Sequence, residues 1–189
     1  MLIVEKCKME RLMNSDFLKM KRLFLKQSYI DAWELYADSM EDENACLWDY
    51  IILTASNELQ AEAFRKEIAC RLEKKVIPDR IHYAVIPDPD GRRVGSGGAA
   101  FNVLKYLADI EGEGFADKRI LVIHSGGDSK RIPQYSVCGK LFSPVPRQLP
   151  DGRMSTLFDE FMIAMAGIPG RIESGMLTLS GDVMLLFNA

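Results

Sequence analysis

Hydrophobic and polar positions follow two different periods along this chain. Up to about residue 45, large apolar side chains such as Phe17, Met20 and Phe24 recur every three or four positions, which predicts helix. Ser28, with Asp31 three positions later, resembles a capping box and predicts a break between two helices. We therefore expect a helical N-terminal extension over residues 1–45 that packs on the remainder, residues 46–189. The alternative is a partner-binding helix pair.

From Cys46 onward, short apolar runs alternate with helical patterns. Four strands are predicted, at Tyr50–Leu53, Ile81–Ile86, Arg119–Ile123 and Met176–Leu179. The helices between them are expected to begin near Asn57 (with Gln60 three positions later), Gly95 and Ser155. The first helix is expected to have an apolar face of Ala61, Phe64, Ile68 and Leu72. The second carries Phe101, Leu104 and Ala108, and in the third Phe158, Phe161, Met162 and Met165 are expected to face inward. Alternation of this kind predicts an α/β fold with a mostly parallel sheet.

Composition narrows the range of functions. The 189 residues are 48% hydrophobic and 27% charged, which is typical of a globular protein. A net charge of −3 gives no basic excess, so we expect neither a nucleic-acid nor a membrane partner. Four cysteines without C-x-x-C spacing and only two histidines argue against a structural zinc site. The expected location is the cytoplasm.

The residues suited to chemistry gather where the predicted strands end. In open parallel sheets the ligand crevice lies at the carboxyl ends of the strands. After the third strand, Gly126 and Gly127 expose backbone N–H groups that can point at phosphate oxygens, while Arg131 and Lys140 can bind phosphate by charge. The spacing does not fit a Walker A loop, and a solvated surface turn is the alternative. His124 is either a base or a histidine that merely ends a strand.

Two further positions fit an anion site. The segment Gly95-Ser96-Gly97-Gly98 opens a helix, whose N-terminus attracts anions, although a flexible loop before a capped helix is the alternative. Asp182 follows the last strand and suits Mg²⁺, which usually takes one or two carboxylates together with substrate phosphates. Together these residues predict phosphoryl or nucleotidyl chemistry.

The run His-Ser-Gly-Gly-Asp-Ser-Lys-Arg-Ile-Pro at residues 124–133, with Gly-Lys-Leu-Phe-Ser-Pro-Val-Pro at 139–146, resembles the fucose-1-phosphate guanylyltransferase family. That family includes the guanylyltransferase half of bifunctional fucokinase/fucose-1-phosphate guanylyltransferases. Residues 48–64, the Asp-Pro-Asp-Gly at 88–91, the Val-Gly-Ser-Gly-Gly-Ala at 94–99 and the Ser-Gly-Asp-Val at 180–183 are also similar. The resemblance runs from about residue 46 to the end of the chain.

The resemblance implies a Rossmann-like nucleotide-diphospho-sugar transferase fold, an α/β/α sandwich. It implies that GTP and fucose 1-phosphate react to give GDP-fucose and pyrophosphate, with Mg²⁺ as cofactor. The implied nucleotide contacts are Gly95, Ser96, Gly97, Gly98, Gly126, Gly127, Asp128 and Ser129. Arg131 would hold the departing pyrophosphate, Lys140 the phosphates and Asp182 the metal. In the wider superfamily the arginine-bearing loop usually follows the first strand, whereas here two strand–helix units precede it.

The resemblance also implies that this chain is the N-terminal part of a longer enzyme. Its last strand would then leave an unpaired sheet edge, which favours self-association. Two other functions stay open at this point: part of a fucokinase polypeptide, or a non-catalytic nucleotide-binding or dimerisation module.

Overall fold

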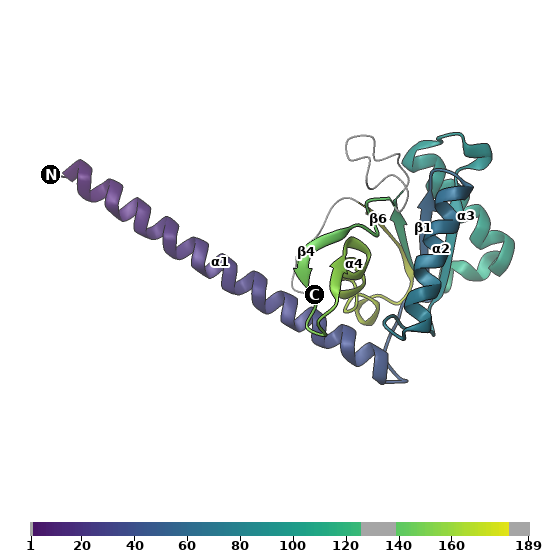
Figure 1. The fold of residues 1–189 in the computed structure, drawn as a ribbon, viewed down its shortest axis with the longest axis horizontal. Coiled ribbons are helices and arrows are strands. Elements are labelled where there is room, and N and C mark those ends of the chain that lie inside the picture. Colours follow the sequence, from purple (N-terminus) through teal and green to yellow (C-terminus); the bar gives the residue numbers. More distant parts are fainter. Residues whose placement is uncertain (1, 126–138, 182–189) are drawn as a thin grey trace.

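A sheet of four parallel strands forms the centre of the molecule (Figure 1). The computed structural model describes residues 2–125 and 139–181, without the side chains of residues 2–15. In chain order its elements are α1 (Leu2–Glu41), β1 (Tyr50–Ala55), α2 (Glu58–Glu73), β2 (His82–Pro87), α3 (Gly95–Glu111), β3 (Arg119–His124), β4 (Pro144–Gln148), β5 (Met154–Thr156), α4 (Leu157–Ala164) and β6 (Gly175–Ser180). Short 3-10 helices occupy Pro89–Gly91, Gly112–Asp117 and Pro169–Arg171.

The strand order in the sheet is β2-β1-β3-β6, and each neighbouring pair is parallel. All four predicted strands are confirmed within one or two residues at their ends. The chain passes from β1 to β2 on one side and then returns across β1 to β3 on the other. The winding direction therefore reverses between β1 and β3, and such a reversal is where doubly wound sheets form their ligand crevice.

Side chains of β1 alternate between two apolar clusters, one on each face of the sheet. Ile51 and Leu53 belong to the cluster that includes Phe64 of α2 and residues of α4. Ile52 packs on the opposite face, in the cluster that contains Val103 and Leu107 of α3, among others. The strand is buried on both faces, which explains why its sequence is a continuous apolar run and not an alternation of apolar and polar residues. This arrangement confirms the expected Rossmann-like α/β/α architecture.

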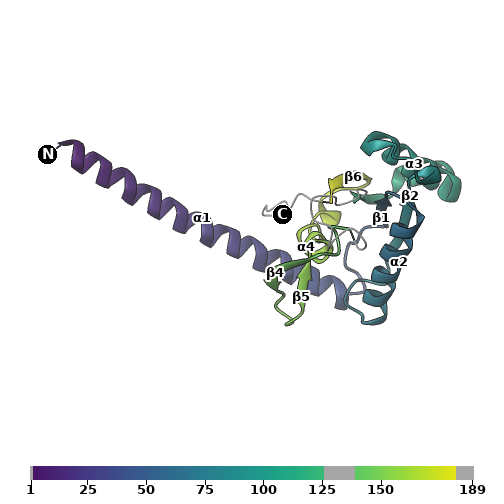
Figure 2. The same cartoon turned by 45° about the horizontal axis from the view of Figure 1, so that its top comes forward.

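The predicted break in the N-terminal helical region is wrong, because α1 is continuous from Leu2 to Glu41. The Oγ of Ser28 donates a hydrogen bond to the carbonyl of Phe24, one turn back, instead of capping a new helix. Figures 1 and 2 show the N-terminal part of α1 extending away from the sheet. Its C-terminal part packs against α4, and Tyr36 in that part is buried. The domain boundary at residue 45 stays a prediction. No helix in the described part of the chain is long and apolar enough to span a membrane.

The buried face of α3 differs from the apolar residues that the sequence analysis named in this helix. Ala99, Val103 and Leu107 are the buried residues of this helix, whereas Phe101 is 73% exposed. Residues four positions apart line the contact with the sheet, and the apolar residues named from the sequence, at 101, 104 and 108, lie on a different side of the helix. Periodicity alone did not separate the two stripes, because apolar residues occupy both.

The predictions for α2 and α4 are confirmed with small shifts. Asn57 caps α2 by accepting a hydrogen bond from the backbone N of Gln60 at 2.9 Å. Helix α4 begins at Leu157, two residues later than expected, and its four predicted inward residues are buried. The antiparallel hairpin of β4 and β5 was not predicted, because two prolines in β4 speak against a strand.

Candidate functional site

The carboxyl ends of β1, β3 and β6 are tied together by short polar contacts. The Oγ of Ser125 donates to the carbonyl of Thr54 at 2.7 Å, which joins the residue after β3 to β1. The backbone N of Gly181 donates to the carbonyl of His124 at 2.8 Å, and a Cβ added to Gly181 would lie 2.9 Å from that oxygen. A glycine is therefore needed where the chain leaves β6. The chain is therefore held at this edge of the sheet at Ser125, directly before the predicted glycine loop, and at Gly181, directly before Asp182.

His124 lies half-buried at this edge, opposite Thr54 in the register of β3 with β1. Its Nδ1 is 3.3 Å from the hydroxyl oxygen of Thr54. Burial lowers the pKa of His124, and the negative charge of Asp88 opposes that shift only in part. The ring is therefore mainly neutral at pH 7, as a proton acceptor or a strand-end hydrogen-bonding group requires. The geometry allows either of the two roles expected for it.

Lys140 lies close to the end of β1, because the residue before it packs on the start of α2. Gly139 has a φ of +62°, and a Cβ there would lie 3.0 Å from the ring of Phe64 and 3.3 Å from Nε2 of Gln60. The next residue, Leu141, is completely buried, and its carbonyl accepts a hydrogen bond from the backbone N of Phe158 at 2.8 Å. The backbone of Lys140 is therefore fixed on both sides, while its side chain is half-exposed.

The glycine segment Gly95–Gly98 forms the first turn of α3 and not a separate loop before it. Gly95 has a φ of +71°, and a Cβ on Gly98 would lie 2.6 Å from Cβ of Val94, so both positions favour glycine. Val94 precedes the helix without a side-chain cap, and Gly95, Ser96 and Gly97 are exposed. The first-turn N–H groups can therefore bind an anion, as helix N-termini do. Because α2 and α3 cover opposite faces of the sheet, this segment and Lys140 flank the strand ends from the two faces.

Gly126, Gly127, Asp128, Ser129 and Arg131 lie outside the described residues, and so does Asp182. Their positions relative to Lys140 stay predictions. Within the ranges that the structure describes, no group of three or more His, Cys, Asp or Glu side chains is arranged to hold a metal ion. The expected Mg²⁺ site at Asp182 is thus untested.

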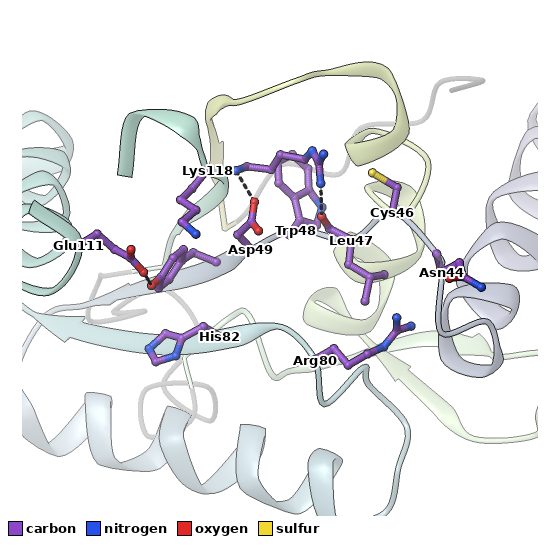
Figure 3. A pocket seen from close by; sticks show the side chains of 12 residues that line it. Asn44, Cys46, Leu47, Trp48, Asp49, Arg80, His82, Glu111 and Lys118 are labelled. Atoms are coloured by element: carbon purple, nitrogen blue, oxygen red, sulfur yellow. Dashed lines mark hydrogen bonds between the residues drawn. The ribbon is translucent and has the colours of Figure 1, made fainter. Parts of the chain in front are cut away.

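A hollow of about 510 Å³ lies at the opposite edge of the sheet, before the strands begin (Figure 3). Its polar groups are engaged in holding that edge together. The backbone N of Arg119 donates to Asp49 at 2.7 Å, and the guanidinium of Arg80 donates to carbonyls at the end of α1. Tyr50 donates from its hydroxyl to Glu111. These contacts give the hollow a structural role, and the chemistry favours the carboxyl edge as the candidate site.

Sequence reasoning missed the role of the Gln60 side chain. A capping box would direct it to the backbone N of Asn57, but its Oε1 accepts from the backbone N of Ser56 at 2.8 Å and from the Ser56 hydroxyl at 3.1 Å. Gln60 is only 5% exposed and lies between the end of β1 and Gly139. The spacing from Asn57 was the available signal, but it indicated a cap and not a link between segments.

Comparisons with known proteins agree with the resemblance. Residues 112–189 match the model of the fucose pyrophosphorylase domain. The chain is 32% identical over 142 residues to a fucose-1-phosphate guanylyltransferase of Mus musculus, covering 75% of this chain and 23% of that protein. It is 33% identical over 168 residues to a bifunctional fucokinase/GDP-fucose pyrophosphorylase of Arabidopsis thaliana, covering 75% of this chain and 16% of the relative. An L-fucokinase/L-fucose-1-P guanylyltransferase of Bacteroides fragilis is 31% identical over 121 residues, or 57% of this chain and 12% of that protein.

The chain thus spans less than a quarter of the length of these curated relatives. No solved structure matches it. The matched region contains β3, Gly139, Lys140 and β6, which are the parts that form the carboxyl edge beside β1. Over residues 112–189 the chain thus matches the fucose pyrophosphorylase domain model, and over 75% of its length it is similar to fucose-1-phosphate guanylyltransferases.

Proposed function

We propose that this chain is the nucleotide-binding part of a sugar-1-phosphate guanylyltransferase that makes GDP-fucose. The observation that carries the proposal is the family match over residues 112–189, which begins before β3 and includes Lys140. The packing of Gly139 against the first two turns of α2, the helix that follows β1, supports it, because Gly139 directly precedes Lys140 in the chain.

The reaction needs no covalent intermediate with the protein. An oxygen of the phosphate in fucose 1-phosphate attacks the α-phosphorus of GTP in line. The bond from the α-phosphorus to the oxygen that bridges to the β-phosphate breaks, and pyrophosphate leaves with that oxygen. Such transfers depend on positioning and on neutralising the charge of the phosphate oxygens.

In this proposal Lys140 supplies positive charge to the phosphates, and Arg131 holds the departing pyrophosphate. The exposed N–H groups of Gly95, Gly97 and their neighbours in the first turn of α3 contact the nucleotide from the other face of the sheet. Residues 126–129 would complete the nucleotide contacts.

Mg²⁺ would be held by Asp182 together with substrate phosphates, a donor set that this ion prefers, and would neutralise phosphate charge there. The close packing of Gly181 on His124 supports this, because it brings the chain to the site's edge just before Asp182.

Two alternatives remain from the sequence. The Arabidopsis and Bacteroides relatives carry both a kinase and a transferase name, which favours part of a fucokinase polypeptide as the second candidate. The third is a nucleotide-binding or dimerisation module without catalysis. A cytoplasmic location stays a prediction in each case.

Calorimetric titration of the chain with GTP, with and without Mg²⁺, tests the proposal, followed by an assay of GTP release from GDP-fucose and pyrophosphate. Binding that strengthens with Mg²⁺, together with GTP release, is the expected result. Binding without turnover favours the module, and phosphorylation of free fucose favours the kinase. Absence of any GTP binding contradicts the proposal.

A further inference from the structure

A buried amide links three parts of the carboxyl edge that are far apart in the sequence. Gln60 is in the first turn of α2, Ser56 follows β1, and Gly139 precedes Lys140. The Oε1 of Gln60 accepts two hydrogen bonds from Ser56, and its Nε2 lies beside Gly139, where an added Cβ would come within 3.3 Å of it. The side chain of Gln60 thus lies between the end of β1 and the segment that carries Lys140.

We infer that Gln60 is a positioning residue for Lys140. This inference rests on the proposed function, in which the ammonium of Lys140 binds substrate phosphate. It assigns to Gln60 no contact with substrate. Gln60 acts by setting how closely the backbone at Gly139 approaches the end of β1.

The fit at Gly139 leaves little freedom for that backbone. Its left-handed φ and its contacts with Phe64 and Gln60 both exclude a side chain. The Ser143 hydroxyl donates to the Gly139 carbonyl at 2.9 Å, and the Ser143 backbone N donates to the Lys140 carbonyl at 3.1 Å. A tight turn therefore begins at the Gln60 contact and includes Lys140.

The far side of this turn is anchored independently of Gln60. Phe142 packs on Phe64 with ring centroids 5.2 Å apart, and Leu141 is completely buried. Removing the Gln60 amide should therefore loosen the start of the turn and move Lys140 without unfolding the core. Displacements of about 1 Å at a phosphate-binding group are enough to lower turnover on the order of 100-fold.

Two variants distinguish the role of the Gln60 amide oxygen from that of its amide nitrogen. Gln60→Glu keeps the oxygen that accepts from Ser56 and removes the amide hydrogens that face Gly139. Gln60→Ala removes both. Gln27→Ala is the matched control, since Gln27 is an exposed glutamine on α1 whose amide donates a hydrogen bond to Asp31.

The first measurement is hydrogen exchange of the backbone amides of residues 139–143 in the unliganded chain. We expect exchange there to be roughly tenfold faster in both Gln60 variants, because each one alters the packing of the amide nitrogen beside Gly139, with β1 and α4 unchanged. Unaltered exchange over 139–143 in Gln60→Glu and Gln60→Ala overturns the inference, whatever the activity.

The second measurement is GDP-fucose pyrophosphorolysis. We expect kcat to fall about 10- to 100-fold in the Gln60 variants with a smaller change in KM, and Gln27→Ala to match the wild type. A kcat equal to the wild-type value overturns the inference. If the unaltered chain has no turnover but exchange over 139–143 responds, the proposed function fails and the link from Gln60 to Lys140 stands.

Discussion

At the scale of single residues, the proposed site depends on Lys140 being held in place while its side chain stays accessible. Buried or tightly packed residues lie on both sides of it, at Gly139 and Leu141. A lysine on a fixed backbone can present its charge to phosphate at a lower entropic cost than a lysine on a free loop.

Lys140→Ala should lower guanylyltransferase turnover about 100-fold or more, because a cation that stabilises transition-state charge is removed. The thermal midpoint should stay close to that of the wild type, since the side chain is half-exposed. Arg131→Ala should act in the same direction. The control is Lys66→Ala, which breaks only an exposed pair with Glu62 on α2. Steady-state rates that do not change in Lys140→Ala would remove this residue from the mechanism.

His124 gives the fold a pH dependence of definite sign. Its folded-state pKa is lowered, chiefly by burial, whereas the unfolded chain keeps the ordinary value of about 6.5. The unfolded state therefore binds the proton first as the pH falls, and stability is lost from about pH 6.5 downward. Urea unfolding at several pH values should show this loss in the wild type and a shallower slope in His124→Asn. Equal slopes in the two proteins would mean that His124 does not control this effect.

At the scale of elements, α2 and α4 are joined through one buried guanidinium. Arg71 of α2 donates to Asp159 of α4 at 3.0 Å and to Glu67 at 2.6 Å, and it lies over the ring of Phe142. Burial alone would lower the pKa of Arg71, but the hydrogen bonds and charges of Asp159 and Glu67 outweigh burial and raise it. Asp159 also closes the capping box with Thr156 at the start of α4.

Asp159→Asn should therefore destabilise the protein by about 3 kcal/mol, because it leaves a buried charge with one partner fewer and weakens a helix cap. Urea denaturation measures this free energy. Asp151→Asn provides the matched control, since it alters an exposed pair with Arg153 and should cost less than about 1 kcal/mol. A similar small cost for both variants would show that the buried pair is not needed.

At the scale of the whole molecule, two exposed regions of the described residues are candidates for contact with a partner. One is β6, the outermost strand of the described sheet, where most residues are exposed. The other is the part of α1 beyond the sheet, where Phe24 is 54% exposed (Figure 2). Exposed edges of sheets can pair with another chain, as the proposed self-association requires.

Met176→Lys should weaken self-association by about tenfold or more if the β6 edge mediates it, since a charge on an edge strand opposes pairing. Sedimentation equilibrium measures the effect. The comparison variant is Phe24→Lys on α1. Weakening by Phe24→Lys alone would assign association to the helix and contradict the edge.

The sequence by itself determined the strands of this protein and its similarity to a known family. Buried strands such as β1 are apolar on both faces, so continuous apolar runs predicted them, and the ordered motifs at 124–133 and 139–146 carried the similarity. Local hydrogen bonding likewise allowed Asn57 to be recognised as a cap.

Only the tertiary structure decided which residues of different elements contact one another. Ser28 bonds to its own helix and not to a new one, Phe101 is exposed although its spacing suits a core, and β4 forms despite its prolines. Above all, the partner of Gln60 was set by how β1, α2 and Gly139 pack. Sequence spacing defines neighbours along one element, but contacts between elements depend on the relative placement of their axes, which no local pattern encodes.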